Sequence, residues 1–483
     1  MVVRHLLRHW LFYGFLAVNI TTFFFVLRED SKDGPRVPLS AFLERSGQTI
    51  IDPRQASSRQ PDVTAIILNW SRFPNVLRIS GLLCGDALRD TIALDFLSTG
   101  CAASRLRIVN SPSNVLFEAR YLACYKASTP WCYIQDDDYL VSPEVIWSMR
   151  HKVAEGKQEP IYLGPPHEQL LTHLRQVRSS NWSSSFSWLG YGSIMSRKEA
   201  GLFLNAMKSL EFETDERAMA DNYFSVLRNV VPETWFDHNN NLGGGEPFTV
   251  GAAGDERNNV HILRATEYLS MLFPCEGSSC SSHRKETDPV APEFVRRSAN
   301  LERDRKAIYK AACLKSACVL ETSIQLFQRA ETRMASRPTD MLIAEQGNPH
   351  WFREKRLPFH LDHPLSNAVD GLSNTAFRSE DVGQGDFISL DLLRRVDYPA
   401  MSMLWVADET TAHCLEKGQL LVGDSVASLV PSAASPSCAE ADHDAHNTLR
   451  FCSAPVPAGR HFRLVLRGCS GILSLHEVRL IRA

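Results

Sequence analysis

The sequence predicts two folded units: an α/β unit with a Rossmann-like mixed sheet, and a C-terminal all-β sandwich of jelly-roll type. Between residues 63 and 165, β-rich runs alternate with helical segments, which is typical of a mostly parallel sheet covered by helices on both faces. After residue 338, short alternating strands follow turn-rich segments and helical signals are scarce. The chain has 483 residues, 44% of them hydrophobic and 22% charged, so both units can bury a core.

An apolar segment at residues 10–27 predicts a transmembrane helix at the N-terminal end. A helix of this length is about 27 Å long, and Arg4 and Arg8 lie on its N-terminal side. The positive-inside rule therefore places residues 1–9 in the cytosol and the rest of the chain in a lumen. A cleaved signal peptide is the alternative, but no clear small-residue cleavage site accompanies the apolar run. We expect a single-pass type II protein of the Golgi or endoplasmic reticulum membrane.

Cysteine usage fits a secretory lumen, where disulfides form and persist. The count of 12 is even, and the close pairs Cys275/Cys280 and Cys313/Cys318 would enclose small loops if they were oxidised. Zinc binding is the alternative, although the sequence has no Cys-x-x-Cys spacing. We therefore expect disulfides, with a connectivity that the sequence leaves open.

The expected elements follow one another in a regular order. The proline-containing residues 28–61 predict a polar stem, and the α/β unit starts abruptly with a buried-type strand at 63–69. The further expected elements are a helix at 75–88, strands at 92–97 and 106–109, a helix at 117–127, a strand at 131–135, a helix from Pro143, a strand at 161–163, and two helices within 182–235, the second at 216–231. The expected units are a cytosolic tail at 1–9, an anchor at 10–27, a stem at 28–61, the α/β unit at 62–285, a helical connection at 286–337 and the sandwich at 338–483.

Residues 237–259 predict a long loop that lies over a binding site. The stretch is polar and rich in glycine, and such stretches are uncommon inside a compact domain unless they serve as lids or binding loops. A disordered linker is the alternative. Residues 286–337 are charged and helix-prone, which predicts a helical connection to the second unit.

Three consecutive carboxylates, Asp136, Asp137 and Asp138, follow the strand expected at 131–135. Ligands of α/β sheets bind at the carboxyl ends of strands, so these acids lie where a site is expected. Alternate side chains of an extended chain share a face, so Asp136 and Asp138 should converge while Asp137 points elsewhere. Converging carboxylates suit Mn²⁺ or Mg²⁺, which prefer oxygen ligands and complete their shells with substrate phosphates. A polar turn without chemistry is the alternative.

Several stretches together resemble the GT-A nucleotide-sugar glycosyltransferases. They are the strand Ile66–Arg72, the segment Phe117–Arg120, the acids Asp136–Asp138, which are similar to the Asp-x-Asp metal motif, and the helix that carries Asp221. The chain is most similar to the exostosin-type hexosaminyltransferases of glycosyltransferase family 64 and their fungal relatives. Leu163–His167 is similar to the Gly-Phe-Pro-Pro-Arg stretch of that family, with His in the Arg position. The resemblance covers roughly residues 62–270 and implies a GT-A fold there.

The resemblance also implies where a UDP-sugar and a metal ion would bind. Asp138 would be the main ligand of Mn²⁺ or Mg²⁺, with Asp136 as a second ligand. A metal that bridges Asp138 and the UDP diphosphate would stabilise the charge on the departing group. The residues expected to bind the nucleotide-sugar are Asn69, Arg72, Asn114, Arg120, Asp136, Asp137 and Arg257.

Asp221 is the expected catalytic residue, because it matches an acid that lies near the anomeric carbon in the family. It would position the acceptor hydroxyl or accept its proton. Ala220 stands where the family has Glu, so the resemblance does not imply a retaining or an inverting outcome. The alternative for Asp221 is a solvated acid on a helix face. His238 is expected to be a loop residue rather than a ligand.

The tail resembles discoidin-type (F5/8 type C) sandwiches and related carbohydrate-binding modules. Residues 367–379 match their Ala-x-Asp-Gly-x-x-x-Thr-x-Trp-x-Ser signature, with Phe377 in place of the Trp. Residues 387–392 and 475–478 match the strand that follows and the closing strand. The resemblance implies that Asp370 and Glu477 can hold a structural Ca²⁺.

Together these features predict a lumenal, metal-dependent glycosyltransferase. It would transfer a sugar, for which an N-acetylhexosamine is one candidate, from a UDP-sugar to a glycan or glycoconjugate hydroxyl. A membrane-tethered carbohydrate-binding protein without catalytic activity is the alternative. A polysaccharide hydrolase ranks last, because it needs two opposed carboxylates rather than adjacent ones. The net charge of −3 gives no argument for nucleic acid as a partner.

Overall fold

A computed structural model of the 483-residue chain provides the fold. The structure describes residues 43, 48–54, 61–69, 72–85, 113–156, 159–178, 182–238, 240–244, 252–273, 290–297, 307–327, 359–379, 382–440, 449–469 and 471–482. The transmembrane segment predicted at 10–27, the strands predicted at 92–97 and 106–109, and the pair Cys275/Cys280 lie outside these residues. None of the described helices has the length and hydrophobicity that a membrane crossing requires.

The first unit is built on a mixed sheet, as predicted. Its strands lie side by side in the order β8 (Glu233–Phe236), β4 (Ile161–Gly164), β7 (Ser193–Ser196), β3 (Trp131–Asp136) and β2 (Val63–Leu68). β2 is parallel to β3 and β4 is parallel to β8, whereas β7 runs antiparallel between β3 and β4. β3 is therefore an inner strand, and its first five residues are buried. This places the three aspartates directly after a rigid central strand.

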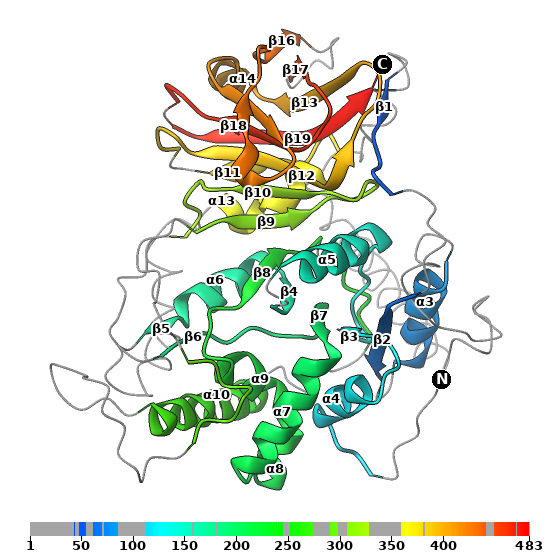
Figure 1. The fold of residues 1–483 in the computed structure, drawn as a ribbon, viewed down its shortest axis with the longest axis vertical. Helices are drawn as coiled ribbons and strands as arrows, with labels where there is room; N and C mark the ends of the chain where they lie inside the picture. The colour runs from blue at the N-terminus through cyan, green and yellow to red at the C-terminus, as the bar shows by residue number, and fades with distance from the viewer. Residues whose placement is uncertain are drawn as a thin grey trace, which may run out of the picture.

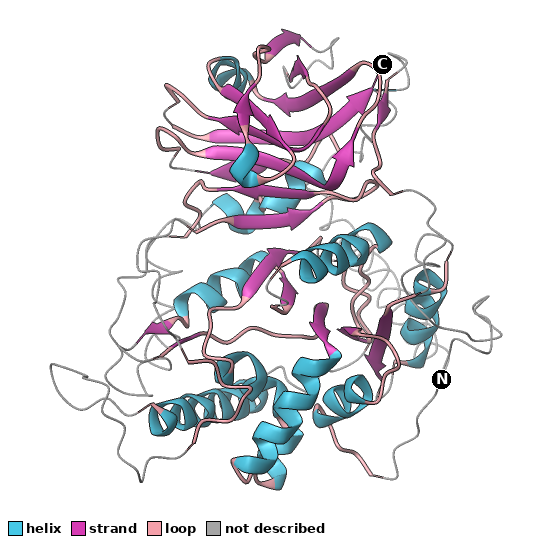
Figure 2. Cartoon of the chain, viewed as in Figure 1, coloured by secondary structure: helices cyan, strands magenta, loops and turns pink. Residues whose placement is uncertain are grey.

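Helices cover this sheet on both sides (Figures 1 and 2). They are α3 (Phe73–Leu83), α4 (Glu118–Tyr125), α5 (Pro143–Glu155), α6 (Pro166–Leu174), α7 (Arg197–Ser209), α8 (Thr214–Ala218), α9 (Ala220–Leu227) and α10 (Ala252–Leu272). A short ribbon, β5 (Val177–Arg178) with β6 (Ser183–Ser184), lies beside them. The prediction of a loop throughout 237–259 was wrong from residue 252 onward. There the buried Ile262, Ala265 and Leu269 recur at helical spacing and anchor α10 against α9.

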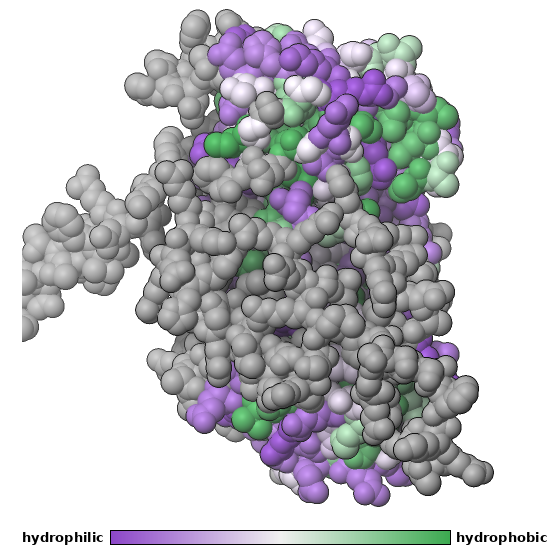
Figure 3. All heavy atoms as spheres, turned by 90° about the vertical axis from the view of Figure 1, so that its left-hand side faces the viewer, coloured by the Kyte–Doolittle hydropathy of each residue, from purple (hydrophilic) through white to green (hydrophobic). Residues whose placement is uncertain are grey.

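The C-terminal unit is a β-sandwich, as predicted. One layer contains β1 (Thr49–Ile50), β19 (Leu473–Arg482), β13 (Met401–Ala407), β17 (Arg450–Pro455) and β16 (Ser437–Glu440), with β11 (Phe377–Ser379) also paired to β19. The facing layer contains β15 (Val430–Pro431), β14 (Gln419–Gly423), β18 (Gly459–Val465) and β12 (Phe387–Val396). The short helices α13 (Phe359–Asp362) and α14 (Glu409–Glu416) accompany the sheets. Figure 3 shows hydrophobic and hydrophilic side chains intermixed over one face of this unit.

A β-hairpin joins the two units, and the prediction of a helical connection at 286–337 was wrong for its described residues 290–297 and 307–327. β9 (Tyr309–Ala312) and β10 (Val319–Thr322) pair with each other, β10 pairs with β12 of the sandwich, and β9 pairs with β8 of the α/β unit. The strands therefore form one continuous sheet of eleven described strands through both units (Figure 1). The Lys and Ala residues of β9 favour a helix locally, but the pairing partners on both sides override that preference.

The predicted stem also takes part in the sandwich. Residues Thr49–Ile50 form β1, which pairs with the end of β19, and the neighbouring Ile51 is buried in the sandwich core. Leu43 is buried against Leu404 and Val406. These apolar side chains explain why this part of the stem is ordered although its overall composition is polar.

Four disulfides hold described segments together. Cys313–Cys318 closes the β9–β10 hairpin, which confirms that predicted pair. The others are Cys124–Cys132, Cys414–Cys469 and Cys438–Cys452. Cys124–Cys132 ties α4 to β3 and therefore fixes the helix of Arg120 against the strand of the aspartates.

Buried ion pairs reinforce the junction between the two units. The Asp391 side chain on β12 is fully buried, and its carboxylate lies 2.5 Å from Lys152 Nζ of α5 and 2.7 Å from Arg460 Nε of β18. Arg460 also reaches Glu155 of α5, at 2.6 Å. These cations hold the pKa of Asp391 well below its usual range, even though burial alone would raise it. The junction therefore depends on a fully buried carboxylate that is paired with two cationic side chains instead of being hydrated.

We predict that Asp391→Asn destabilises the protein by about 3 kcal/mol, because Lys152 and Arg460 lose a fully buried counter-charge. Asp424→Asn is the matched control, since the Asp424–Arg395 pair is more than half exposed and should contribute less than about 1 kcal/mol. Denaturant unfolding of both variants measures the difference. Equal effects of the two substitutions would show that the buried pair does not stabilise the junction.

Candidate functional site

The three aspartates lie at the carboxyl end of β3, where the chain turns away from the sheet. The Asp136 amide donates to the Gly190 carbonyl at 2.8 Å, and a Cβ on Gly190 would lie 2.0 Å from Asp136 Oδ2. A side chain at position 190 would overlap the Asp136 carboxylate, which would have to move away from its present position. The Asp137 side chain is 6% exposed and that of Asp138 is 20% exposed, so both are largely withdrawn from water.

Two arginines compensate the charge of the aspartates. Arg120 of α4 is buried and donates to both Asp136 and Asp221, the latter at 2.7 Å. Arg72 Nη1, just before α3, lies 2.8 Å from Asp137 and 3.3 Å from Asp138. The expectation that Asp137 points away from Asp138 was wrong, because both carboxylates contact Arg72. Asp136 bonds to Arg120, and its convergence with Asp138 stays a prediction. The strand ends at Asp136, so the alternation of an extended chain does not continue through the turn.

Asp138 differs from Asp136 and Asp137 in the hydrogen bonding of one carboxylate oxygen. Its Oδ1 is buried and has no hydrogen-bond partner, while Oδ2 faces Arg72. Burial raises the pKa of Asp138, the charges of Asp136 and Asp137 raise it further, and the charge of Arg72 opposes the rise. A buried carboxylate oxygen without a partner is costly unless a ligand satisfies it. Asp138 is thus the acid of the three that has a buried oxygen without a hydrogen-bond partner.

Asp221 is buried within the helix layer rather than solvated on a helix face. Its Oδ2 accepts from Arg120, and its Oδ1 accepts from the Tyr121 hydroxyl at 3.0 Å. Burial raises the pKa of Asp221 to about 6, against the opposing effect of Arg120. Because both oxygens are already bonded and the side chain is only 2% exposed, the geometry suits the anchoring of Arg120 better than proton transfer to an acceptor.

The described residues 240–244 of the glycine-rich stretch contact the aspartates and their arginine. The Leu242 amide donates to the Asp138 carbonyl at 2.7 Å, and Arg72 Nε donates to the Gly244 carbonyl at 2.7 Å. Asn75 of α3 donates to the Gly243 carbonyl at 2.8 Å. Gly244 has a φ of +106°, a conformation that favours glycine. Arg72 therefore joins the covering loop to Asp137 and Asp138.

Other predicted site residues have local partners. Asn69 Oδ1 accepts from the Arg72 amide at 3.1 Å and so orients Arg72, whereas Asn114 Oδ1 accepts from the Leu116 amide within its own turn. Arg257 lies half-buried on α10, the helix that packs against α9. His238 is half-buried and donates from Nε2 to the Ala312 carbonyl of β9 at 2.7 Å. Sequence reasoning missed Tyr121 and Gly190, although the hydroxyl beside Arg120 and the Gly-Tyr-Gly run were visible signals.

The carboxylates proposed for calcium have partners as well. Asp370 accepts from the Leu372 amide and from the Thr375 hydroxyl, each at 2.8 Å. Glu477 accepts from the Gly371 amide at 2.7 Å and lies 3.0 Å from Arg479 Nε. Within the described residues, no group of three or more His, Cys, Asp or Glu side chains is arranged to hold a metal ion.

Comparisons with known proteins bear on part of the chain. No protein-family model matches, and no curated protein matches. Similar solved structures include an F5/8 type C domain of a Bacteroides fragilis protein (14% identity, 26% of this chain, 83% of that chain, TM-score 0.20). Another is the family 32 carbohydrate-binding module of Clostridium perfringens NanJ in complex with galactose (13% identity, 24% of this chain, 83% of that chain, TM-score 0.17). A third is the module of the same family from AlyQ in complex with 4,5-unsaturated mannuronic acid (19% identity, 24% of this chain, 82% of that chain, TM-score 0.16).

These TM-scores are low, so the sandwich assignment rests on the strand pairings described above. The structures just named are an F5/8 type C domain and carbohydrate-binding modules, and each covers about a quarter of this chain. The resemblance of the α/β unit to GT-A glycosyltransferases therefore stays a prediction from the sequence.

We predict that Tyr121→Phe destabilises the protein by about 1–3 kcal/mol, because a buried oxygen of Asp221 loses its donor. Tyr125→Phe, on the exposed side of the same helix, should change stability by less than about 0.5 kcal/mol. Chemical denaturation at neutral pH compares the two variants. If both phenylalanine variants were as stable as the wild type, Asp221 would not depend on the hydroxyl.

Proposed function

We propose that the chain is a metal-dependent glycosyltransferase that takes a sugar from a UDP-sugar at the carboxyl end of β3 and transfers it to a glycan hydroxyl. The observation that carries this proposal is the buried, unpartnered Oδ1 of Asp138 next to Arg72, with Arg120 bonded to the neighbouring Asp136. One available acid next to two guanidinium groups suits a ligand that combines a divalent cation with a diphosphate. The sequence resemblance supports the same substrate class.

The residues present fit a metal ion that is held mainly by its substrate. Mg²⁺ and similar cations in nucleotide sites are commonly bound by one or two carboxylates plus phosphate oxygens, so a three-carboxylate cluster is not needed. Asp138 would hold the ion, and the ion would supply Lewis-acid stabilisation to the departing diphosphate. We assign Asp136 to the orientation of Arg120 rather than to the metal, because its carboxylate is bonded to that guanidinium.

The two arginines would then hold the diphosphate. Nε of Arg120 is buried without a hydrogen-bond partner, so this guanidinium retains a donor after it has bonded Asp136 and Asp221. Arg72 is 13% exposed and contacts both Asp138 and the covering loop. Charge-assisted hydrogen bonds from guanidinium groups to phosphate are among the strongest in proteins. Asp221 would hold Arg120 in place, and a group other than Asp221 would accept the proton of the acceptor hydroxyl.

The second candidate function is a carbohydrate-binding protein without catalytic activity. The observation that favours it is that Asp136, Asp137 and Asp221 are each bonded to an arginine. Such pairs could serve stability alone, in which case the sandwich would bind the glycan. The solved sandwich modules named above include complexes with galactose and with a mannuronic acid derivative.

We predict that Asp138→Asn abolishes the Mn²⁺-dependent binding of UDP while the protein stays folded, because the oxygen that would hold the ion loses its charge. Asp215→Asn is the matched control, since Asp215 lies in the same unit and forms an exposed pair with Arg264. Isothermal calorimetry with UDP in Mn²⁺ and in chelator measures the effect, and circular dichroism checks the fold.

Two results would contradict the proposal. One is UDP binding by Asp138→Asn as tight as that of Asp215→Asn, and the other is wild-type UDP binding that chelator does not weaken. Glycan binding by the wild type without any metal-dependent UDP binding would support the second candidate function.

A further inference from the structure

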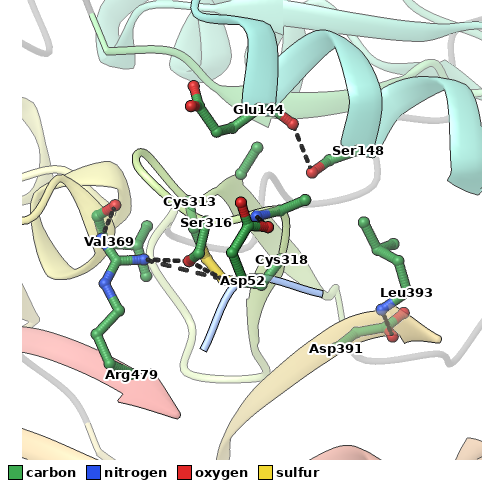
Figure 4. Close-up of a disulfide and its surroundings, with 12 residues drawn as sticks. Asp52, Glu144, Ser148, Cys313, Ser316, Cys318, Val369, Asp391, Leu393 and Arg479 are labelled. Atoms are coloured by element: carbon green, nitrogen blue, oxygen red, sulfur yellow. Dashed lines mark hydrogen bonds between the residues drawn. A yellow bond between two sulfur atoms is a disulfide. The ribbon is translucent and has the colours of Figure 1, made fainter. Parts of the chain in front are cut away.

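A fully buried arginine lies where the discoidin resemblance implies a calcium ion. Arg479 on β19 places Nε 3.0 Å from Glu477 Oε1. Its Nη2 donates to the Val369 carbonyl at 2.7 Å and its Nη1 to the Ser316 hydroxyl at 3.4 Å (Figure 4). The guanidinium therefore contacts the closing strand, the turn that precedes Asp370 and the loop of the β9–β10 hairpin.

A lysine approaches the same turn from the hairpin. Lys315 lies in the loop closed by Cys313–Cys318 and donates from Nζ to the Gly371 carbonyl at 3.3 Å. A Cβ on Gly371 would lie 3.0 Å from Nζ, and Gly371 has a φ of +79°, so the close approach needs glycine there. The Gly371 amide meanwhile donates to Glu477. The backbone of Gly371 is thus held between an acid and a lysine.

The donor set does not fit a calcium ion. Calcium needs six to eight oxygen ligands, as a general rule, with lone pairs free to face the ion. Both oxygens of Asp370 accept hydrogen bonds, and one oxygen of Glu477 accepts from Gly371. The other oxygen of Glu477 has no hydrogen-bond partner, but the Arg479 guanidinium lies 3.0 Å from it and occupies the place of a cation. Burial raises the pKa of both carboxyls, and the charges of Arg479 and Lys315 oppose that rise. Two protein cations already provide the positive charge that an ion would bring.

We infer that Arg479 and Lys315 together take the place of the divalent cation in this sandwich. Their positive charges offset Asp370 and Glu477, and their hydrogen bonds lock the hairpin loop to the turn at 369–375. The hairpin also joins the sandwich to the α/β unit, so the built-in cations stabilise the junction. The sandwich is therefore independent of calcium.

Thermal unfolding of the full-length chain in Ca²⁺ and in EGTA tests this inference. The wild type should melt at the same temperature in both conditions. Lys315→Met, which keeps the length of the side chain but removes its charge, should lower Tm by about 2–4 °C. Lys198→Met is the control, because Lys198 is 74% exposed and its carboxylate neighbour is 3.9 Å away, so its Tm should not change.

Stabilisation of the wild type by Ca²⁺ would overturn the inference, as would terbium luminescence that Asp370→Asn abolishes. An unchanged Tm of Lys315→Met would overturn the role of the lysine. If Lys315→Met failed to fold, the calcium comparison on the wild type would still decide the question, and Lys315→Arg should retain the Tm of the wild type. None of these measurements depends on the glycosyltransferase proposal.

Discussion

The candidate site depends on the balance of charge between three adjacent aspartates and two arginines. Carboxylates in consecutive positions at the end of a buried strand repel one another, and that cost rises as water is excluded. Arg72 binds the adjacent Asp137 and Asp138, and Arg120 binds Asp136 together with Asp221 of α9, so each guanidinium reduces the repulsion between carboxylates. The Cys124–Cys132 disulfide supports this arrangement by tying α4 to β3.

The β9–β10 hairpin connects the sandwich to the loop beside the aspartates. It continues the sheet of the α/β unit into the sandwich, and it receives the hydrogen bond from His238 at the root of the glycine-rich loop. The loop reaches from there to Asp138 and Arg72. Rigid elements on both sides thus position the segment that covers the aspartates, as binding loops require. The sandwich is part of the scaffold of the site and not only an appended module.

Much of this architecture could be predicted from the sequence because it depends on local patterns. The buried strands β2 and β3, the helices α4 and α5, and the position of the aspartates all follow from periodicity and turn signals. The pairing of Arg120 with Asp221 could not be predicted from such patterns, since it joins residues 101 positions apart. The hairpin was missed for a related reason: β9 is stabilised by β8 and β10, and its own residues carry little strand preference. Long-range pairing decided both outcomes.

A crystal structure of the full-length chain with Mn²⁺ and UDP tests the central claim most directly. The account predicts manganese bonded to an oxygen of Asp138 and to the diphosphate, with the guanidinium groups of Arg72 and Arg120 facing the phosphate oxygens. A structure with an empty pocket at the end of β3, or with the nucleotide bound away from these residues, would contradict the account.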